Sequence, residues 1–73
     1  MIVLRFEELL REKERQEGRR ITIKEVAKET GISRQTLTRL SDPRGHVTNT
    51  AVLDRLCKYF RCQPGELLEY IEG

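Results

Sequence analysis

Residues 23–42 read IKEVAKETGISRQTLTRLSD, and the spacing within them indicates how the chain folds. Ala27, Gly31, Leu37 and Leu40 stand out. Two short helices that cross at close range need a small residue at the crossing, and the tight turn between them needs a residue that tolerates positive φ. Ala27 and Gly31 meet these needs, and the two leucines can hold the second helix to a core. The stretch predicts a helix-turn-helix at about residues 23–42.

Capping signals set the ends of both helices. Thr22 and Glu25 form a capping box, in which the threonine oxygen accepts the free amide of Glu25 and the glutamate reaches back. This predicts a helix over 23–30. Ser33 is expected to cap the next helix, over 34–41.

The flanking sequence predicts three further helices. Apolar residues at helical spacing indicate helices over about 4–17, 50–60 and 65–70, with Thr48 and Asn49 as alternative caps for the second of these. No stretch shows the alternation of a strand. We therefore expect an all-α fold in which five helices share one core.

Length and composition narrow the class of protein. Seventy-three residues suffice for a single domain over 1–73, and 14 basic against 12 acidic residues exclude an extended polybasic tail. No apolar run approaches the length of a membrane span, and charges follow Met1–Leu4 at once, which excludes a signal-peptide core. We expect a cytoplasmic protein with no membrane partner.

The cysteines and the histidine offer little for catalysis. Cys57 and Cys62 have neither a redox nor a zinc spacing, and His46 is the only histidine. We expect two reduced thiols in the core, no metal, no cofactor and no enzyme activity. A small hydrolase or redox protein that uses these three residues is the rival hypothesis.

The basic excess is concentrated in one region. Residues 32–48 contain Arg34, Arg39 and Arg44 against Asp42 alone. The predicted helix 34–41 thus carries a local positive charge, which suits a surface that lies against the phosphates of DNA.

The outer face of helix 34–41 carries the candidate base contacts. They are Arg34, Gln35, Thr38 and Arg39. Arginine can pair with guanine and glutamine with adenine, whereas the plain alternative is a solvated helix face. The candidate DNA backbone contacts are Thr22, Lys24, Ser33, Thr36, Arg44, His46, Thr48 and Asn49. For the last four, ordinary loop chemistry is an equal alternative.

Segments 23–40 and 53–68 resemble the Cro/XRE-type helix-turn-helix domains of the lambdoid phage repressor family. The resemblance implies a five-helix, lambda repressor-like fold, sequence-specific binding of double-stranded DNA, and transcriptional control, usually as a dimer. Three features depart from the family pattern, one of which is Pro43 in the turn after helix 34–41, where many members have an acidic residue followed by glycine. Ile23 replaces a polar residue, often glutamine, that touches phosphate, and the connector 18–22 is about two residues longer than usual.

We therefore expect a regulator, in function a repressor, that occupies an operator as a homodimer. In the C-terminal patch of Leu67, Leu68, Tyr70 and Ile71, we expect two core positions and a dimer contact from the remainder. The rival from a different class is a protein-interaction module, such as an antitoxin or adaptor, that uses the same fold to dock a protein partner.

Overall fold

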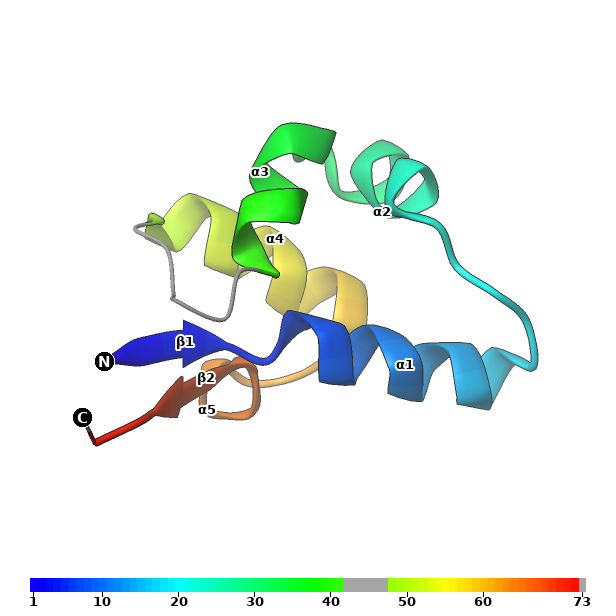
Figure 1. Cartoon of the computed structure of the whole chain (residues 1–73). Helices are drawn as coiled ribbons and strands as arrows, with labels where there is room; N and C mark the ends of the chain where they lie inside the picture. The colour runs from blue at the N-terminus through cyan, green and yellow to red at the C-terminus, as the bar shows by residue number, and fades with distance from the viewer. Residues whose placement is uncertain (42–47, 73) are drawn as a thin grey trace.

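The structure, a computed structural model, describes residues 1–41 and 48–72. Within these ranges the chain forms five helices and a two-stranded sheet (Figure 1). The helices are α1 (Phe6–Glu17), α2 (Ile23–Thr30), α3 (Arg34–Leu40), α4 (Thr50–Phe60) and α5 (Pro64–Leu67), and the strands are β1 (Ile2–Leu4) and β2 (Leu68–Tyr70). The five predicted helices are confirmed, but the fold is not strictly all-α.

The sheet corrects the prediction at both ends of the chain. β1 pairs with β2 in antiparallel register, with Val3 opposite Glu69. Consequently α1 begins at Phe6 rather than at Leu4, and the last helix ends at Leu67 instead of continuing to residue 70. The physical reason is that strand pairing between the two ends is non-local, so neither segment alone carries a strand pattern. Val3 is buried, and its side chain comes from the strand β1.

The core lies between the helix-turn-helix and the remaining helices. Its largest fully buried side chains are Phe6, Val26, Leu37, Leu56 and Leu67, which come from all five helices. Because each helix contributes a buried residue to one core, α2 and α3 pack against α1, α4 and α5.

Local capping forms the helix-turn-helix much as the sequence predicts. The Oγ1 atom of Thr22 accepts a hydrogen bond from the backbone amide of Glu25 at 3.1 Å. Gly31 ends α2 in the left-handed region, with φ of 76°, and its N–H donates to the carbonyl of Ala27. Ile32 is buried in the turn. The second half of the capping box is wrong, because the Glu25 carboxylate accepts from Arg19 instead.

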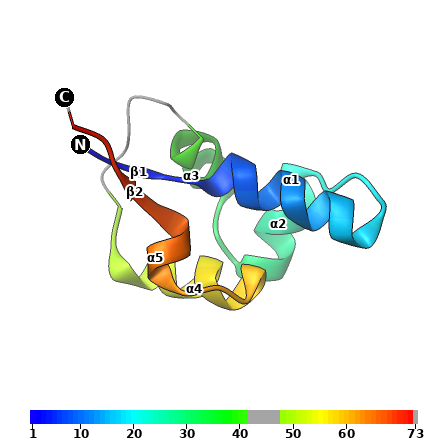
Figure 2. The same cartoon turned by 90° about the horizontal axis from the view of Figure 1, so that it is seen from below.

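The two chain ends lie side by side at one end of the molecule, and the α1–α2 connector lies at the other (Figures 1 and 2). α3 lies between these ends with its outer side uncovered by another described element. None of the described helices is long and apolar enough to cross a membrane.

Candidate nucleic-acid interface

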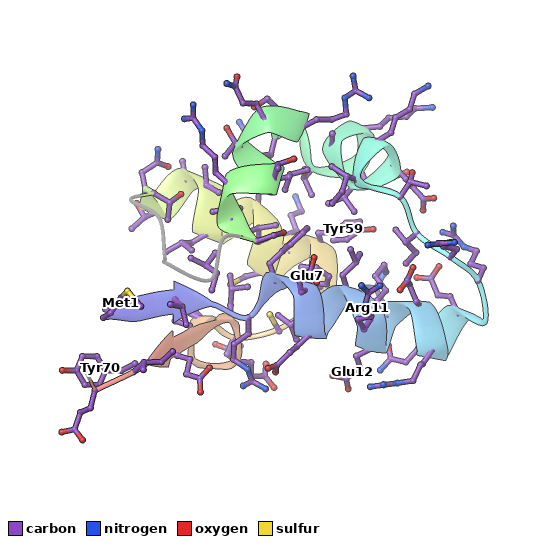
Figure 3. All side chains as sticks on the ribbon, viewed as in Figure 1. Met1, Glu7, Arg11, Glu12, Tyr59 and Tyr70 are labelled. Carbon is purple, nitrogen blue, oxygen red and sulfur yellow. The ribbon has the colours of Figure 1, made fainter. Side chains whose placement is uncertain are left out.

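α3 has one buried face and one exposed face. Leu37 and Leu40 are 0% and 3% exposed, and they fasten the helix to the core. The four candidate base contacts, Arg34, Gln35, Thr38 and Arg39, are all exposed. In Figure 3, nitrogen-tipped side chains project outward from α3 and from α2. The outward position predicted for the four residues is therefore confirmed.

The long side chains on this face have no partner within residues 1–41 and 48–72. Arg34, Gln35 and Arg39 make no side-chain hydrogen bond or ion pair with another residue of these ranges, and α3 has no acidic residue in its first turn. The guanidinium donors of Arg34 and Arg39 are thus not engaged by any carboxylate of residues 1–41 and 48–72. Guanidinium groups of this kind match the acceptor pairs of guanine and of phosphate.

Thr38 differs from its neighbours because its donor is already in use. Its hydroxyl donates to the backbone carbonyl of Arg34 at 2.9 Å. The oxygen can still accept a hydrogen bond, and the methyl group can still contact an apolar group. Thr38 can therefore accept from an exocyclic amine of cytosine or adenine, or pack against a thymine methyl.

Ser33 and Thr36 form the cap of α3. The Ser33 hydroxyl accepts from the backbone amide of Thr36 at 3.2 Å and donates to the Thr36 hydroxyl at 2.9 Å. The donor of Ser33 is thus engaged, whereas the proton of the half-buried Thr36 hydroxyl is left to donate. Of these two candidate backbone contacts, Thr36 has the better chemistry for a phosphate oxygen.

The remaining backbone candidates come from three elements. Thr22 and Lys24 are exposed at the start of α2. Asn49 caps α4, because its Oδ1 atom accepts from the amide of Val52 at 3.0 Å, and its side-chain NH₂ still has donors to offer. Thr48, the alternative cap, is half-buried and lies just before it. The candidates Arg44 and His46 lie outside the described residues.

Sequence reasoning missed one cation on α2. Lys28 is exposed and follows Lys24 by four residues, so both lie on the same side of the helix. The helical period could have identified Lys28, because it places Lys24 and Lys28 on one face of α2. Lys28 therefore adds a second positive charge to that side of α2.

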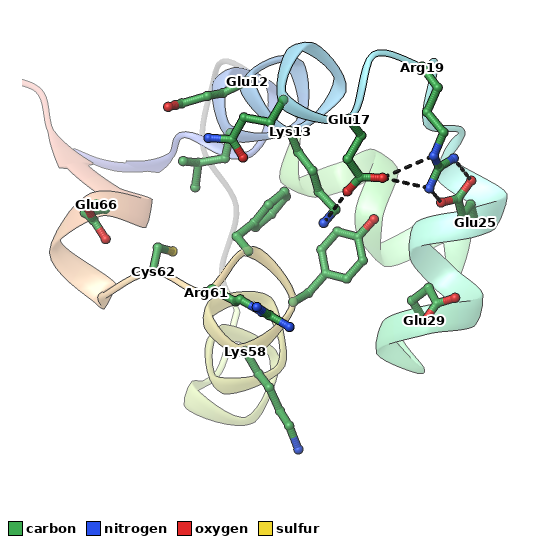
Figure 4. Close-up of a pocket in the computed structure, with 14 residues that line it drawn as sticks. Glu12, Lys13, Glu17, Arg19, Glu25, Glu29, Lys58, Arg61, Cys62 and Glu66 are labelled. Carbon is green, nitrogen blue, oxygen red and sulfur yellow. Dashed lines mark hydrogen bonds and ion pairs between the residues drawn. The ribbon is translucent and has the colours of Figure 1, made fainter.

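A groove of about 810 Å³ lies away from α3, between α1, α2 and α4 (Figure 4). Ion pairs cross its rim. Lys13 bonds Glu17 at 2.7 Å, and the Arg19 guanidinium bridges Glu17 at 3.0 Å and Glu25 at 2.6 Å. The Tyr59 hydroxyl is buried here without a hydrogen-bond partner among the described residues. The charged side chains that line the groove are five carboxylates and four cations, so the groove offers no excess of positive charge for a nucleic acid.

The pKa shifts have structural causes. The backbone amide of Ile21 donates to Glu14 at 2.8 Å and lowers the pKa of that carboxyl, and the Arg19 hydrogen bonds lower the pKa of Glu25. Burial, followed by the neighbouring Cys57, raises the pKa of the Cys62 thiol. A nucleophilic thiol needs a shift in the opposite direction, so this cysteine gives the hydrolase or redox hypothesis no support. Within the described residues, no cluster of His, Cys, Asp and Glu could hold a metal ion.

Known proteins resemble this chain across most of its length. A family model described as the Cro/C1-type HTH DNA-binding domain matches residues 13–73, from within α1 to beyond β2. The chain is 31% identical over 52 residues to YozG of Bacillus subtilis (strain 168), named as an uncharacterized HTH-type transcriptional regulator. That alignment covers 71% of this chain and 62% of YozG, so the chain spans less than two thirds of that relative. No solved structure matches.

Proposed function

The chain belongs to the Cro/C1-type helix-turn-helix DNA-binding family, and we propose that it is a sequence-specific regulator of transcription that reads an operator through α3. In this proposal it is a repressor, because a domain that occupies an operator blocks access of other proteins to the same DNA. One observation carries the proposal above the others. α3 is fastened to the core by two leucines, while its opposite face offers long polar side chains with no described partner.

Base reading follows from the donors and acceptors of that face. Arg34 and Arg39 are suited to the O6 and N7 atoms of guanine, and Gln35 to the N6 and N7 atoms of adenine. Thr38 serves as an acceptor or as a methyl contact, since its own proton bonds the Arg34 carbonyl. Each good bidentate pair contributes about 1–3 kcal/mol of discrimination against the wrong base.

Phosphate contacts position the helix in the groove. Thr22 and Lys24 lie at the start of α2 and Asn49 at the start of α4, where backbone amides and the helix dipole favour an anion. Thr36 adds a hydroxyl donor beside α3. These groups carry no sequence information, but they fix the register in which α3 meets the bases.

A homodimer would match a two-fold operator, and the β1–β2 sheet is the surface that suits it. The exposed large apolar residues of the described chain all lie there or next to it, namely Met1, Ile2, Tyr70 and Ile71. Met1 and Ile71 exchange two backbone hydrogen bonds of 2.8 Å each. In the next pair, Ile2 with Tyr70, the backbone N–H and C=O groups therefore point away from the partner strand. The N–H and C=O groups of Tyr70 thus lie on the free edge of β2, where another strand could pair with them.

The occupant of this edge in our proposal is a second copy of the chain. Antiparallel pairing of β2 with itself about a two-fold axis would be self-complementary. An axis at Glu69 would bring two carboxylates directly opposite each other, whereas an axis at Tyr70 keeps them apart. We therefore assign the axis to Tyr70. Because the sheet lies at the end of the molecule remote from the α1–α2 connector, pairing there leaves α3 uncovered (Figure 1).

Selection of bound duplexes from a random pool tests the proposed function. We expect a recurring sequence with two half-sites about 10–10.5 base pairs apart, centre to centre. A scrambled duplex of the same composition is the control. Equal affinity for the selected and the scrambled duplex at every salt concentration would contradict sequence-specific reading.

A further inference from the structure

The peptide between Gly31 and Ile32 is the hinge of the helix-turn-helix, and both of its polar groups are hydrogen-bonded. Its N–H, on Ile32, donates to the Oγ1 atom of Thr30 at 3.1 Å. Its carbonyl, on Gly31, accepts from Nη1 of Arg55 at 3.2 Å. Gly31 has a φ of 76°, so the chain reverses at this point. The orientation of this peptide plane sets the direction in which α3 leaves α2.

Of these two hydrogen bonds, the one from Arg55 comes from outside the helix-turn-helix. Thr30 belongs to α2 and moves with it, whereas Arg55 belongs to α4 and is 24 residues away in sequence. Within residues 1–41 and 48–72, every other hydrogen bond or ion pair made by a side chain joins residues at most seven apart. The Arg55 bond is therefore the one polar tie in the described chain between the hinge and a separately packed helix.

We infer that Arg55 is a positioning residue for DNA reading, which rests on the function proposed above. It fixes the hinge peptide against α4 and thereby fixes the angle at which α3 presents its outer face. α4 also carries the Asn49 cap at its first turn. Arg55 thus couples α3, which reads bases, to the end of α4 that binds phosphate. Without Arg55, the position of α3 relative to α4 is held less firmly. Base contacts tolerate about half an ångström of misplacement, so this loosening acts on specificity first.

The alternative role for an exposed arginine is direct contact with phosphate, and the salt dependence of binding separates the two. A phosphate contact contributes about one unit to the slope of log K against log salt, and its loss weakens binding to all sequences alike. A positioning residue contributes nothing to that slope. Its loss weakens binding to the cognate sequence more than to a scrambled one.

The test compares Arg55→Met with Lys58→Met. Both substitutions remove one exposed cation of α4 and keep an unbranched stem, but Lys58 makes no bond to the turn. With the duplex selected above and its scrambled control, we expect Arg55→Met to weaken cognate binding roughly five-fold, the size of one net hydrogen bond. Scrambled binding and the salt slope should match those of Lys58→Met. Equal losses on both duplexes with a smaller slope, or no difference from Lys58→Met, would overturn the inference.

A measurement on the free protein tests the hinge bond without DNA. In ¹³C,¹⁵N-labelled protein, Arg55→Met should shift the carbonyl carbon of Gly31 and speed hydrogen exchange of the Ile32 amide, while Lys58→Met should change neither. Unchanged Gly31 and Ile32 signals in Arg55→Met would refute the positioning role. If the wild type instead prefers no duplex, the proposed function fails, and the spectra still report whether Arg55 holds the hinge.

Discussion

The outer face of α3 and the α1–α2 connector both carry two arginines, but among residues 1–41 and 48–72 only the connector holds one of them, Arg19, in ion pairs. Arg19 donates to Glu25 at 2.9 and 2.6 Å and also bridges to Glu17. On α3, Arg34 and Arg39 have no ion-pair partner within the described residues. The difference shows that residue type alone does not identify a binding surface. The carboxylates around a cation decide whether it serves the fold or is left for a ligand.

Removing one arginine from each region is the strongest way to test this contrast. We expect Arg39→Ala to weaken cognate binding by about 5- to 150-fold, the loss of one bidentate base pairing, and to weaken scrambled binding much less. Arg19→Ala removes the same charge from the connector and should leave both affinities close to the wild type. Fluorescence anisotropy titrations of both variants measure this. Similar losses in the two variants would remove the distinction between the regions.

The sheet at the chain ends gives the next largest effect. Tyr70 is 70% exposed, so a substitution there should not disturb the core. Tyr70→Asp places two like charges at the proposed two-fold axis and should give monomers in sedimentation velocity. Because a monomer holds only one half-site, we expect about a ten-fold loss on the selected duplex. Glu72→Asp, an exposed conservative change nearby, is the control. A dimer that survives Tyr70→Asp would place the interface elsewhere.

Lys24 sharpens the comparison by adding a cation expected to contact phosphate rather than bases. We expect Lys24→Ala to weaken cognate and scrambled binding alike, by a few-fold, and to reduce the salt slope by about one. Affinities measured over a range of salt concentrations give both quantities. Lys13→Ala, which removes a lysine already paired with Glu17, should leave the slope unchanged. A loss confined to the cognate duplex would make Lys24 a base-reading residue instead.

The smallest effect concerns stability and comes from the connector. Arg19 lowers the pKa of Glu25 below its ordinary value of 4.5, so the folded state favours the charged carboxylate. This stability is present above about pH 4.5 and is lost as the pH falls through the lower pKa of the folded state. We expect the Tm of the wild type to fall between pH 5 and pH 3. The Tm of Glu25→Gln should fall less over the same interval. At pH 7 the variant should melt at most a few degrees lower, because the ion pair is exposed. An unchanged pH dependence in Glu25→Gln would rule out this contribution.

The parts of the fold that the sequence predicts are those that neighbouring residues determine. The bounds 23–30 for α2, the caps at Thr22 and Ser33, and the left-handed Gly31 all follow from local capping and turn chemistry. The helical period likewise predicted which side chains of α3 face outward. The β1–β2 sheet was not predictable in this way, because it depends on pairing between the two ends of the chain.

The site shows the same division between local and distant determinants. Arg34, Gln35 and Arg39 could be placed on the outer face from periodicity, and their contacts with bases stay a prediction. The engaged donor of Thr38 and the bond from Arg55 to the hinge could not be read from the sequence. The Thr38 bond depends on the rotamer of that side chain, and the Arg55 bond depends on the packing of α4 beside the turn.

A protein–DNA double-mutant cycle tests whether the outer face of α3 reads bases in the major groove. In the selected duplex, each guanine is replaced in turn by 7-deazaguanine, which lacks the N7 acceptor, and affinity is measured for the wild type and for Arg39→Ala. We expect one guanine at which the replacement weakens binding by the wild type but leaves binding by Arg39→Ala unchanged, since the two changes remove the same contact. Additive losses at every guanine would contradict a contact between Arg39 and the base.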